Sequence, residues 1–481
     1  MVSPVSYITV TQIAGLSTTA VQALSSTSLA ALSTAQVAAF TVTEIGVLSS
    51  TQMGQLGTTQ TAALTTSQIA ALTPTQMGFS AAQMAVLSVA QLDSFGAAEI
   101  AVLTTQQVKG LTTTEIAGLT TTQFAVLSAT QVGALTNTQV TGLTTSQFGA
   151  MTTTQLGALS TTQLGSLTTT QVKGLSSTTL AALTTTQVGG LSASGIGVLA
   201  TTQLAALAPT QVAAITTTQM PRLATTQLAA LSAGQLAAVT ATQLGALSTT
   251  QVAGLTSTAV SSLSTTQLGG LSAAQIAALT TTEIVSLTTA EVSGLTTTQV
   301  AGMESTDVGA LTTTQVAALS STQLGALTAT NVVGLTTTQM AGLTTTQLSG
   351  MGATQLGALT GTQAPSLTIT QLASLTTTQV AALSTSAVKA LTTTQFGGLA
   401  VTQVAALTTG QVAQLTTTDL VAMAPTQEAS LTSTQMGALT STQLGALTTT
   451  EVSALTTTQV GAISSSTLAG LTTTQVGVLA A

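Results

Sequence analysis

The sequence of 481 residues contains no cysteine, no histidine and no tryptophan, and only one tyrosine. Without thiols there is no disulfide framework and no thiolate metal site. Without histidine, the common pairs of nucleophile and base and the common zinc sites are excluded as well. The composition therefore predicts a protein that is not an enzyme, has no catalytic, cofactor-binding or metal-binding residues, and needs no cofactor.

Charge is equally scarce. Charged residues make up 3% of the chain, with four basic side chains and a net charge of −7. Nucleic-acid binding is not expected, because such proteins place several lysines or arginines on phosphates. Polar residues interrupt every apolar stretch before it reaches about 18 residues, so no membrane span is expected. Residues 1–7 lack the basic and apolar regions of a cleavable signal peptide.

What is present is a repeat of eight residues. If the recurring leucine is position a, positions a to h read Leu-Thr-Thr-Thr-Gln-Val-Ala/Gly-Ala/Gly. The pattern predicts 59 units in a single repeat domain over residues 8–479, with one shortened unit, a heptad, at 72–78. Residues 1–7 form a lead and residues 480–481 a tail.

Each octet resembles the start of a helix. Thr or Ser at b and Gln or Glu at e form a capping box, in which the b hydroxyl accepts from the e backbone N–H and the e side chain accepts from the b N–H. The apolar residues at a and f then occupy the two positions of a hydrophobic staple. An eight-residue period fits neither a continuous helix nor a continuous strand, so each octet must also contain a corner.

The rarer residue types agree with this register. Basic side chains lie at g or h, towards the negative end of a helix dipole: Lys109, Lys173, Arg222 and Lys389. Three prolines lie at c, the first helical position, where proline is favoured: Pro74, Pro209 and Pro425. Eight of the eleven acidic residues replace Gln at e, near the positive end of the dipole: Glu44, Glu99, Glu115, Glu283, Glu291, Asp307, Asp419 and Glu451.

The helices must be short. Pro221 and Pro365 lie at g, where a longer helix would need the backbone N–H, and glycine is frequent at g and h, where the chain turns out of a helix. The sequence therefore predicts an all-α solenoid of very short capped helices, one per octet. A β-solenoid is the alternative, because Thr and Val favour strands.

One octet cannot fold alone, because ordering eight residues costs about 8–16 kcal/mol while two buried side chains return about 1.5–3 kcal/mol each. Stacking must supply the rest, and Ala and Gly at g and h should allow close approach between turns. Weak points are expected where f is not a large apolar residue, at Thr61, Ala364 and Glu428. The Thr side chains at c and d have no capping role and should face outwards.

Two resemblances follow from these residues. The stretch Leu207-Ala-Pro-Thr-Gln-Val-Ala-Ala-Ile215 resembles the first helix of the repeats in transcription-activator-like effectors. That likeness covers one octet at a time and lacks the second helix and the base-reading loop, so DNA binding does not carry over. The whole chain is similar to Thr/Gln-rich short-repeat proteins of bacteria that are loosely labelled surface or adhesin-like, which implies an extracellular structural role.

Only two groups of carboxylates could have carried chemistry. Glu304 and Asp307 occupy b and e of one unit, and a charged capping box explains them better than an acid–base pair. Glu283 and Glu291 occupy e in adjacent units and could chelate a cation, but a position at a helix start, near the positive end of the dipole, explains them better.

The leading functional hypothesis is a non-enzymatic structural protein that assembles end to end into an extracellular filament, sheath or surface layer. Its motivation is that the repeats run almost to both termini without the polar capping units of most solenoids. Its partners would be copies of itself, and its location extracellular or at the cell surface, reached without a cleavable signal peptide. The alternative is a surface adhesin stalk, or an ice- or glycan-binding module that uses the Thr array.

Overall fold

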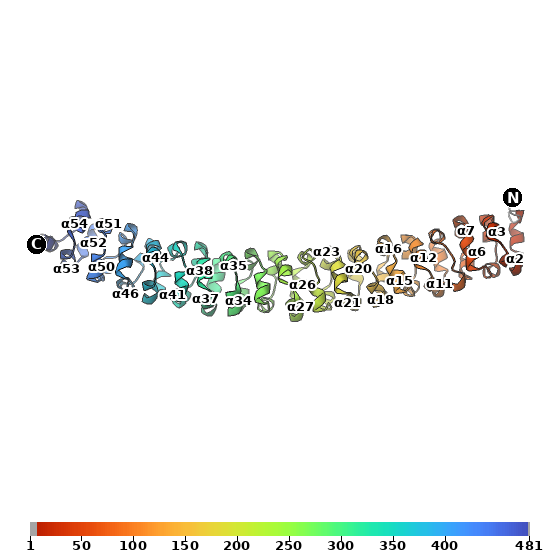
Figure 1. The fold of residues 1–481 in the computed structure, drawn as a ribbon, viewed down its shortest axis with the longest axis horizontal. Helices are drawn as coiled ribbons and strands as arrows, with labels where there is room; N and C mark the ends of the chain where they lie inside the picture. Colours follow the sequence, from red (N-terminus) through yellow and green to blue (C-terminus); the bar gives the residue numbers. More distant parts are fainter. Residues whose placement is uncertain (1–6, 480–481) are drawn as a thin grey trace. The chain divides into compact units, whose positions relative to one another are not determined.

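A computed structural model describes residues 7–479; residues 1–6 of the expected lead at 1–7, and the expected tail at 480–481, lie outside the described residues. The described part contains 56 short α-helices and no strand (Figure 1). The all-α prediction is therefore confirmed, and the β-solenoid alternative is wrong. The structure is a solenoid of very short helices.

Each α-helix begins at position c of its octet, and all but α56 (Thr473–Leu479) end between f and h, as α12 (Thr105–Gly110) and α43 (Ile369–Ala373) illustrate. The capping box predicted from the sequence is present. At α43, Gln371 N donates to Thr368 Oγ1 at 3.2 Å, and Thr368 N donates to Gln371 Oε1 at 2.6 Å. These mutual bonds satisfy amide groups that a helix start leaves without partners.

Three octets form short 3₁₀ helices instead: η2 (Pro74–Gln76), η3 (Met220–Arg222) and η4 (Ala364–Ser366). Proline explains two of them. In η3 and η4 it lies at g, where it removes an amide that a further α-helical turn would use, and η2 lies in the shortened unit. By contrast, Pro209 begins α25 (Pro209–Val212) and Pro425 begins α50 (Pro425–Ala429), as predicted for position c.

The chain divides into two compact units, Met1–Val239 and Thr240–Ala481, and the octets continue through both. Within each unit a helix packs against the third helical element along the chain. In the first unit α12 packs on α9 (Ala81–Met84) and α15 (Ala129–Gly133); in the second, α43 packs on α46 (Thr393–Gly397). One turn of the solenoid therefore contains three octets.

The core is a narrow column of a and f side chains. Leu343 and Leu348 are typical, with exposed fractions of 4% and 0%. The side chains at b, c and d lie on the surface, as at Thr344, Thr345 and Thr346. The prediction that Thr at c and d faces outwards is confirmed for these residues.

Glycine has a different role from the one expected of helix ends. Among the described residues none has a positive φ, so glycine is not needed here for the left-handed conformation. It is needed for close approach: a Cβ built on Gly350 would lie 2.1 Å from the carbonyl oxygen of Ser321 one turn earlier. The expected close contact between turns is therefore present at this position.

Candidate functional site: a glutamine junction between turns

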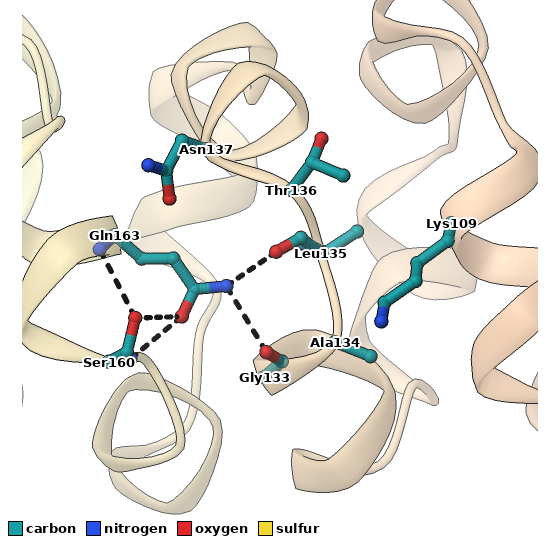
Figure 2. Close-up of a pocket in the computed structure, with 8 residues that line it drawn as sticks. All are labelled: Lys109, Gly133, Ala134, Leu135, Thr136, Asn137, Ser160 and Gln163. Atoms are coloured by element: carbon teal, nitrogen blue, oxygen red, sulfur yellow. Dashed lines mark hydrogen bonds between the residues drawn. The ribbon is translucent and has the colours of Figure 1, made fainter.

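The most elaborate polar arrangement in the molecule is built around the glutamine at position e, and Gln163 shows it clearly (Figure 2). Its Oε1 accepts from the backbone N–H of Ser160 at 2.7 Å and from the Ser160 hydroxyl at 2.9 Å. Its Nε2 donates to the carbonyl oxygens of Gly133 at 3.2 Å and Leu135 at 2.6 Å, one turn earlier. One amide group thus joins the start of its own helix to the end of a helix in the preceding turn.

The same junction recurs with a fixed offset along the chain. Gln68 donates to Phe40 O at 2.7 Å and to Val37 O at 3.0 Å, which lie 28 and 31 residues earlier. Gln371 does the same with Leu343 O at 2.6 Å and Met340 O at 3.0 Å. We call this arrangement the glutamine junction: an e side chain, the b residue of its own octet, and the f, g or a carbonyls of the preceding turn.

The junction explains why a polar residue can be buried at e throughout the structure. Gln68 and Gln371 are 2% and 4% exposed. Burying an amide is costly unless its donors and acceptors are paired, and here both ends of the group are paired. Because these atoms are already occupied, the junction contributes stability and is not suited to catalysis.

A shallow cleft of about 300 Å³ lies beside one junction, at the corner between α15 and α16 (Asn137–Gly142) (Figure 2). Lys109, at the end of α12, contributes the cationic side chain of its lining, and Thr136 and Asn137 contribute polar groups. Ser160 also lines the cleft, but its hydroxyl is bonded to Gln163. The cleft therefore contains a cation and hydroxyl groups but no base that could activate a nucleophile.

Of the carboxylate pair Glu304 and Asp307, only Asp307 makes a capping bond at the start of α36 (Ser305–Ala310). Asp307 Oδ2 accepts from the backbone N–H of Glu304 at 2.9 Å. Burial raises the pKa of Asp307; the bond from the Glu304 N–H lowers it, and the nearby Glu304 charge raises it further. Asp307 therefore serves the helix start, as the sequence suggested.

Glu283 and Glu291 each bond their own helix. Glu283 Oε2 accepts from Thr280 N at 2.6 Å, and Glu291 Oε2 accepts from Thr288 N at 2.5 Å. The described residues contain no group of three or more acidic side chains that could hold a metal ion. Both residues act as capping groups at consecutive helices, α33 (Thr281–Ser286) and α34 (Thr289–Gly294).

The basic side chains lie near helix ends, as their sequence positions predicted. Lys109, Lys173 and Lys389 lie in the last turns of α12, α20 (Thr169–Gly174) and α45 (Thr385–Lys389), and Arg222 closes η3. They belong to octets far apart in the sequence.

The three unusual f positions differ from one another. Ala364 is fully buried in η4. Thr61 is also fully buried, but its hydroxyl donates to Gly57 O at 3.0 Å and accepts from Gln83 Nε2 at 3.2 Å. Glu428 is 3% exposed, and its Oε1 has no hydrogen-bond partner. Of the three, Glu428 alone leaves a buried polar atom unpaired.

The sequence predicted the bonds of the glutamine junction within one octet, but not the bonds from the e side chain to the carbonyls of the preceding turn. A signal did exist, because the residue at e is almost always Gln although Glu would satisfy the capping box equally well. Only the amide can also donate to a carbonyl oxygen.

Comparison with known families agrees with this picture. The model of the ALTTAQ repeat matches six segments of the chain, residues 100–137, 132–161, 141–177, 220–257, 300–337 and 412–449. This is a repeat protein. The six letters of that family name resemble positions h to e of the octet, as in Ala390-Leu391-Thr392-Thr393-Thr394-Gln395. No curated protein matches the chain. In the described residues, no helix is long and apolar enough to cross a membrane.

Proposed function

We propose that the protein is a non-enzymatic structural repeat protein whose copies join end to end into an extracellular filament, sheath or surface layer. The observation that carries this proposal is the glutamine junction, which repeats with the same offset from turn to turn. Most turns offer side-chain amides on one face and helix-end carbonyls on the opposite face. In the first described turn Gln12 supplies the amide, because Ala20 and Ser28 occupy position e in the other two octets. A second copy placed there can form part of the contact that already holds the turns together.

Such a contact joins two different surfaces, so it does not close on itself as a two-fold contact does. The outer described turns also carry apolar surface. Leu16 and Leu24 in the first turn and Leu455 and Leu471 in the last are partly exposed, whereas equivalent leucines such as Leu343 are buried. Covering such side chains favours association.

The chemistry of the surface supports a location outside the cell or at its surface. The exposed b, c and d side chains are mostly hydroxyls, and the whole chain offers only four sites for trypsin-like proteases. The similarity to bacterial surface repeat proteins points the same way.

Electron microscopy and light scattering of the purified full chain test the assembly. We expect filaments that lengthen with protein concentration, and a monodisperse monomer at high concentration would remove the proposal. The substitutions Leu16→Glu and Leu471→Glu place a charge on the outer apolar surfaces and should stop assembly. The controls Thr18→Glu and Thr473→Glu add the same charge at exposed c positions of the same octets and should leave assembly intact.

One observation favours a second candidate, a binding module such as an adhesin stalk or an ice- or glycan-binding face. The exposed Thr side chains at d, such as Thr346 and Thr370, lie one turn apart, and equivalent hydroxyls recur at regular intervals. Thermal hysteresis and binding to immobilised glycans test this candidate. It predicts activity that is lost when successive d threonines in one such column are replaced by lysine, and no activity in either assay would exclude it.

A further inference from the structure

One ionisable side chain of the core belongs neither to a capping box nor to a glutamine junction. Glu428 lies at position f of its octet, in α50, where the other described octets place an apolar residue, with the exception of Thr61. It is 3% exposed, and its Oε1 is buried without a hydrogen-bond partner. A buried carboxylate in this state is costly unless it is protonated or paired.

Thr61 shows which side chain faces an f residue across the turns. There the e residue one turn later, Gln83, donates from Nε2 to the Thr61 hydroxyl at 3.2 Å. One turn after Glu428 the e residue is Glu451, in α53 (Thr449–Ser453), so a second carboxyl occupies the place of the amide. Glu451 Oε2 accepts from the backbone N–H of Thr448, and its charge acts on Glu428.

None of the described helices next to α50 places a cation beside this pair. The helix that packs below α50, α47 (Val401–Ala405), carries no charged residue. Of the neighbouring helices along the chain, α49 (Thr417–Val421) contributes Asp419, and α51 (Ser433–Gly437) contributes no charge. Burial raises the pKa of Glu428 to about 7, and the negative charge of Glu451 adds to that effect.

We propose that Glu428 and Glu451 form a carboxyl pair that holds one proton taken from the solvent and thereby ties two successive turns together. The protonated Glu428 carboxyl donates its O–H to the Glu451 carboxylate, in the place where Gln83 donates to Thr61. When the proton leaves to water, two carboxylates face each other in a low-polarity core, and the turns around them loosen. The pair is a contact between turns that depends on protonation, in a solenoid whose other turns are held by the glutamine junction.

The direction of the pH effect follows from proton binding. Between pH 4.5, the usual pKa of a glutamate, and about pH 7, the folded chain keeps a proton that the unfolded chain has released. Local stability is therefore highest in mild acid and falls as the pH rises through this window. Above the window it levels off at the lower value.

Two measurements on the full-length chain test the proposal. At about pH 6 the infrared spectrum of the wild type minus that of Glu428→Gln should contain the absorption of a protonated carboxyl group. Hydrogen exchange over residues 417–453, corrected for intrinsic rates, should show protection that falls about tenfold or more between about pH 5.5 and about pH 8. Residues 153–190 serve as an internal reference and should not change.

Two further variants make the test specific, and both restore residues that are common at these positions. Glu428→Leu should give high protection at both pH values. Because leucine is common at f, this variant should fold and therefore serves as a control for loss of folding. Glu451→Gln supplies an amide and should move the midpoint of the pH dependence downwards. Absence of the protonated carboxyl signal, or equal protection in the wild type at both pH values, would overturn the proposal. Protection that is restored at about pH 8 when calcium chloride is added would show that the two carboxylates bind a cation in place of a proton. That result would also overturn the proposal.

Discussion

The side chain of Gln371 reaches back to Leu343, where its Nε2 donates to the backbone carbonyl oxygen at 2.6 Å. The two residues are 28 positions apart, and the same amide accepts from the N–H of Thr368 through its oxygen. A single side chain thus fixes where its own helix begins and how that helix sits on the turn before it. The central claim is that this contact, repeated along the chain, determines that three octets make one turn.

The first prediction separates the two halves of the junction. Gln371→Glu keeps an acceptor for Thr368 but replaces the donor with an oxygen that faces the carbonyls of Met340 and Leu343. We expect a local destabilisation of about 2 kcal/mol or more, because a buried group is left unpaired. Hydrogen exchange of residues 337–375 measures it. Thr370→Glu adds the same charge at an exposed neighbour and should have little effect.

The second prediction concerns the close approach between turns. Gly350→Ala should cost about 1–3 kcal/mol, because the new Cβ would lie 2.1 Å from Ser321 O and the backbone must move. Gly342 occupies the same position h in the preceding octet but has no atom within 4 Å of its built Cβ. Gly342→Ala should therefore stabilise by about 0.5–1 kcal/mol. Chemical unfolding followed by circular dichroism compares the two, and equal effects would contradict the proposed role of glycine.

A third prediction uses an octet that lacks half of its cap. Ala400 precedes α47 and provides no side-chain acceptor for the helix start. Ala400→Ser should stabilise this region by about 1 kcal/mol, because a hydroxyl at b accepts from the backbone N–H of Gln403. Val401→Thr adds a hydroxyl at the exposed neighbouring position and should change stability by less than about 0.5 kcal/mol. Protection of residues 399–406 against hydrogen exchange distinguishes these outcomes.

The fourth prediction is a dependence on pH at Asp307. Burial raises the pKa of this carboxyl, so the folded state holds its proton more tightly than the unfolded chain. Stability from this group is present at low pH and is lost as the pH rises through the folded pKa. Asp307→Gln removes the titration and supplies an amide for the junction. We expect this variant to stabilise residues 303–311 more at neutral pH than in mild acid, and the opposite order would refute the assignment.

The sequence predicted the local structure well because that structure depends on residues within one octet. The capping box at Thr368 and Gln371, the helical prolines at 209 and 425, and the exposure of Thr346 all follow from short-range rules. The number of octets per turn did not follow, since a period of eight residues is compatible with several ways of closing a turn. It depends on contacts such as Gln371 to Leu343, whose partners are 28 residues apart.

The expected weak points show the same limit. Position f identified Thr61 and Glu428 as irregular, but the sequence could not show what would face them. Thr61 meets the amide of Gln83, which gives its hydroxyl a partner. Glu428 is instead subject to the charge of another acid, Glu451, and its Oε1 stays unpaired. Whether a polar side chain at f finds a partner depends on the e residue one turn later. That residue is known only once the turn is known to contain three octets.

Distances between spin labels test the central claim most directly, because the chain contains no cysteine and every introduced thiol is unique. Thr298, Thr346 and Thr370 are exposed d residues of the second unit, separated by whole turns if three octets make a turn. Stacked helices lie about 8–10 Å apart, so the pair Thr298→Cys and Thr346→Cys should be separated by about 16–20 Å, and Thr298→Cys and Thr370→Cys by about 24–30 Å. A separation well above 30 Å for the first pair, or one that does not increase by half for the second, would contradict the three-octet turn and the glutamine junction that holds it.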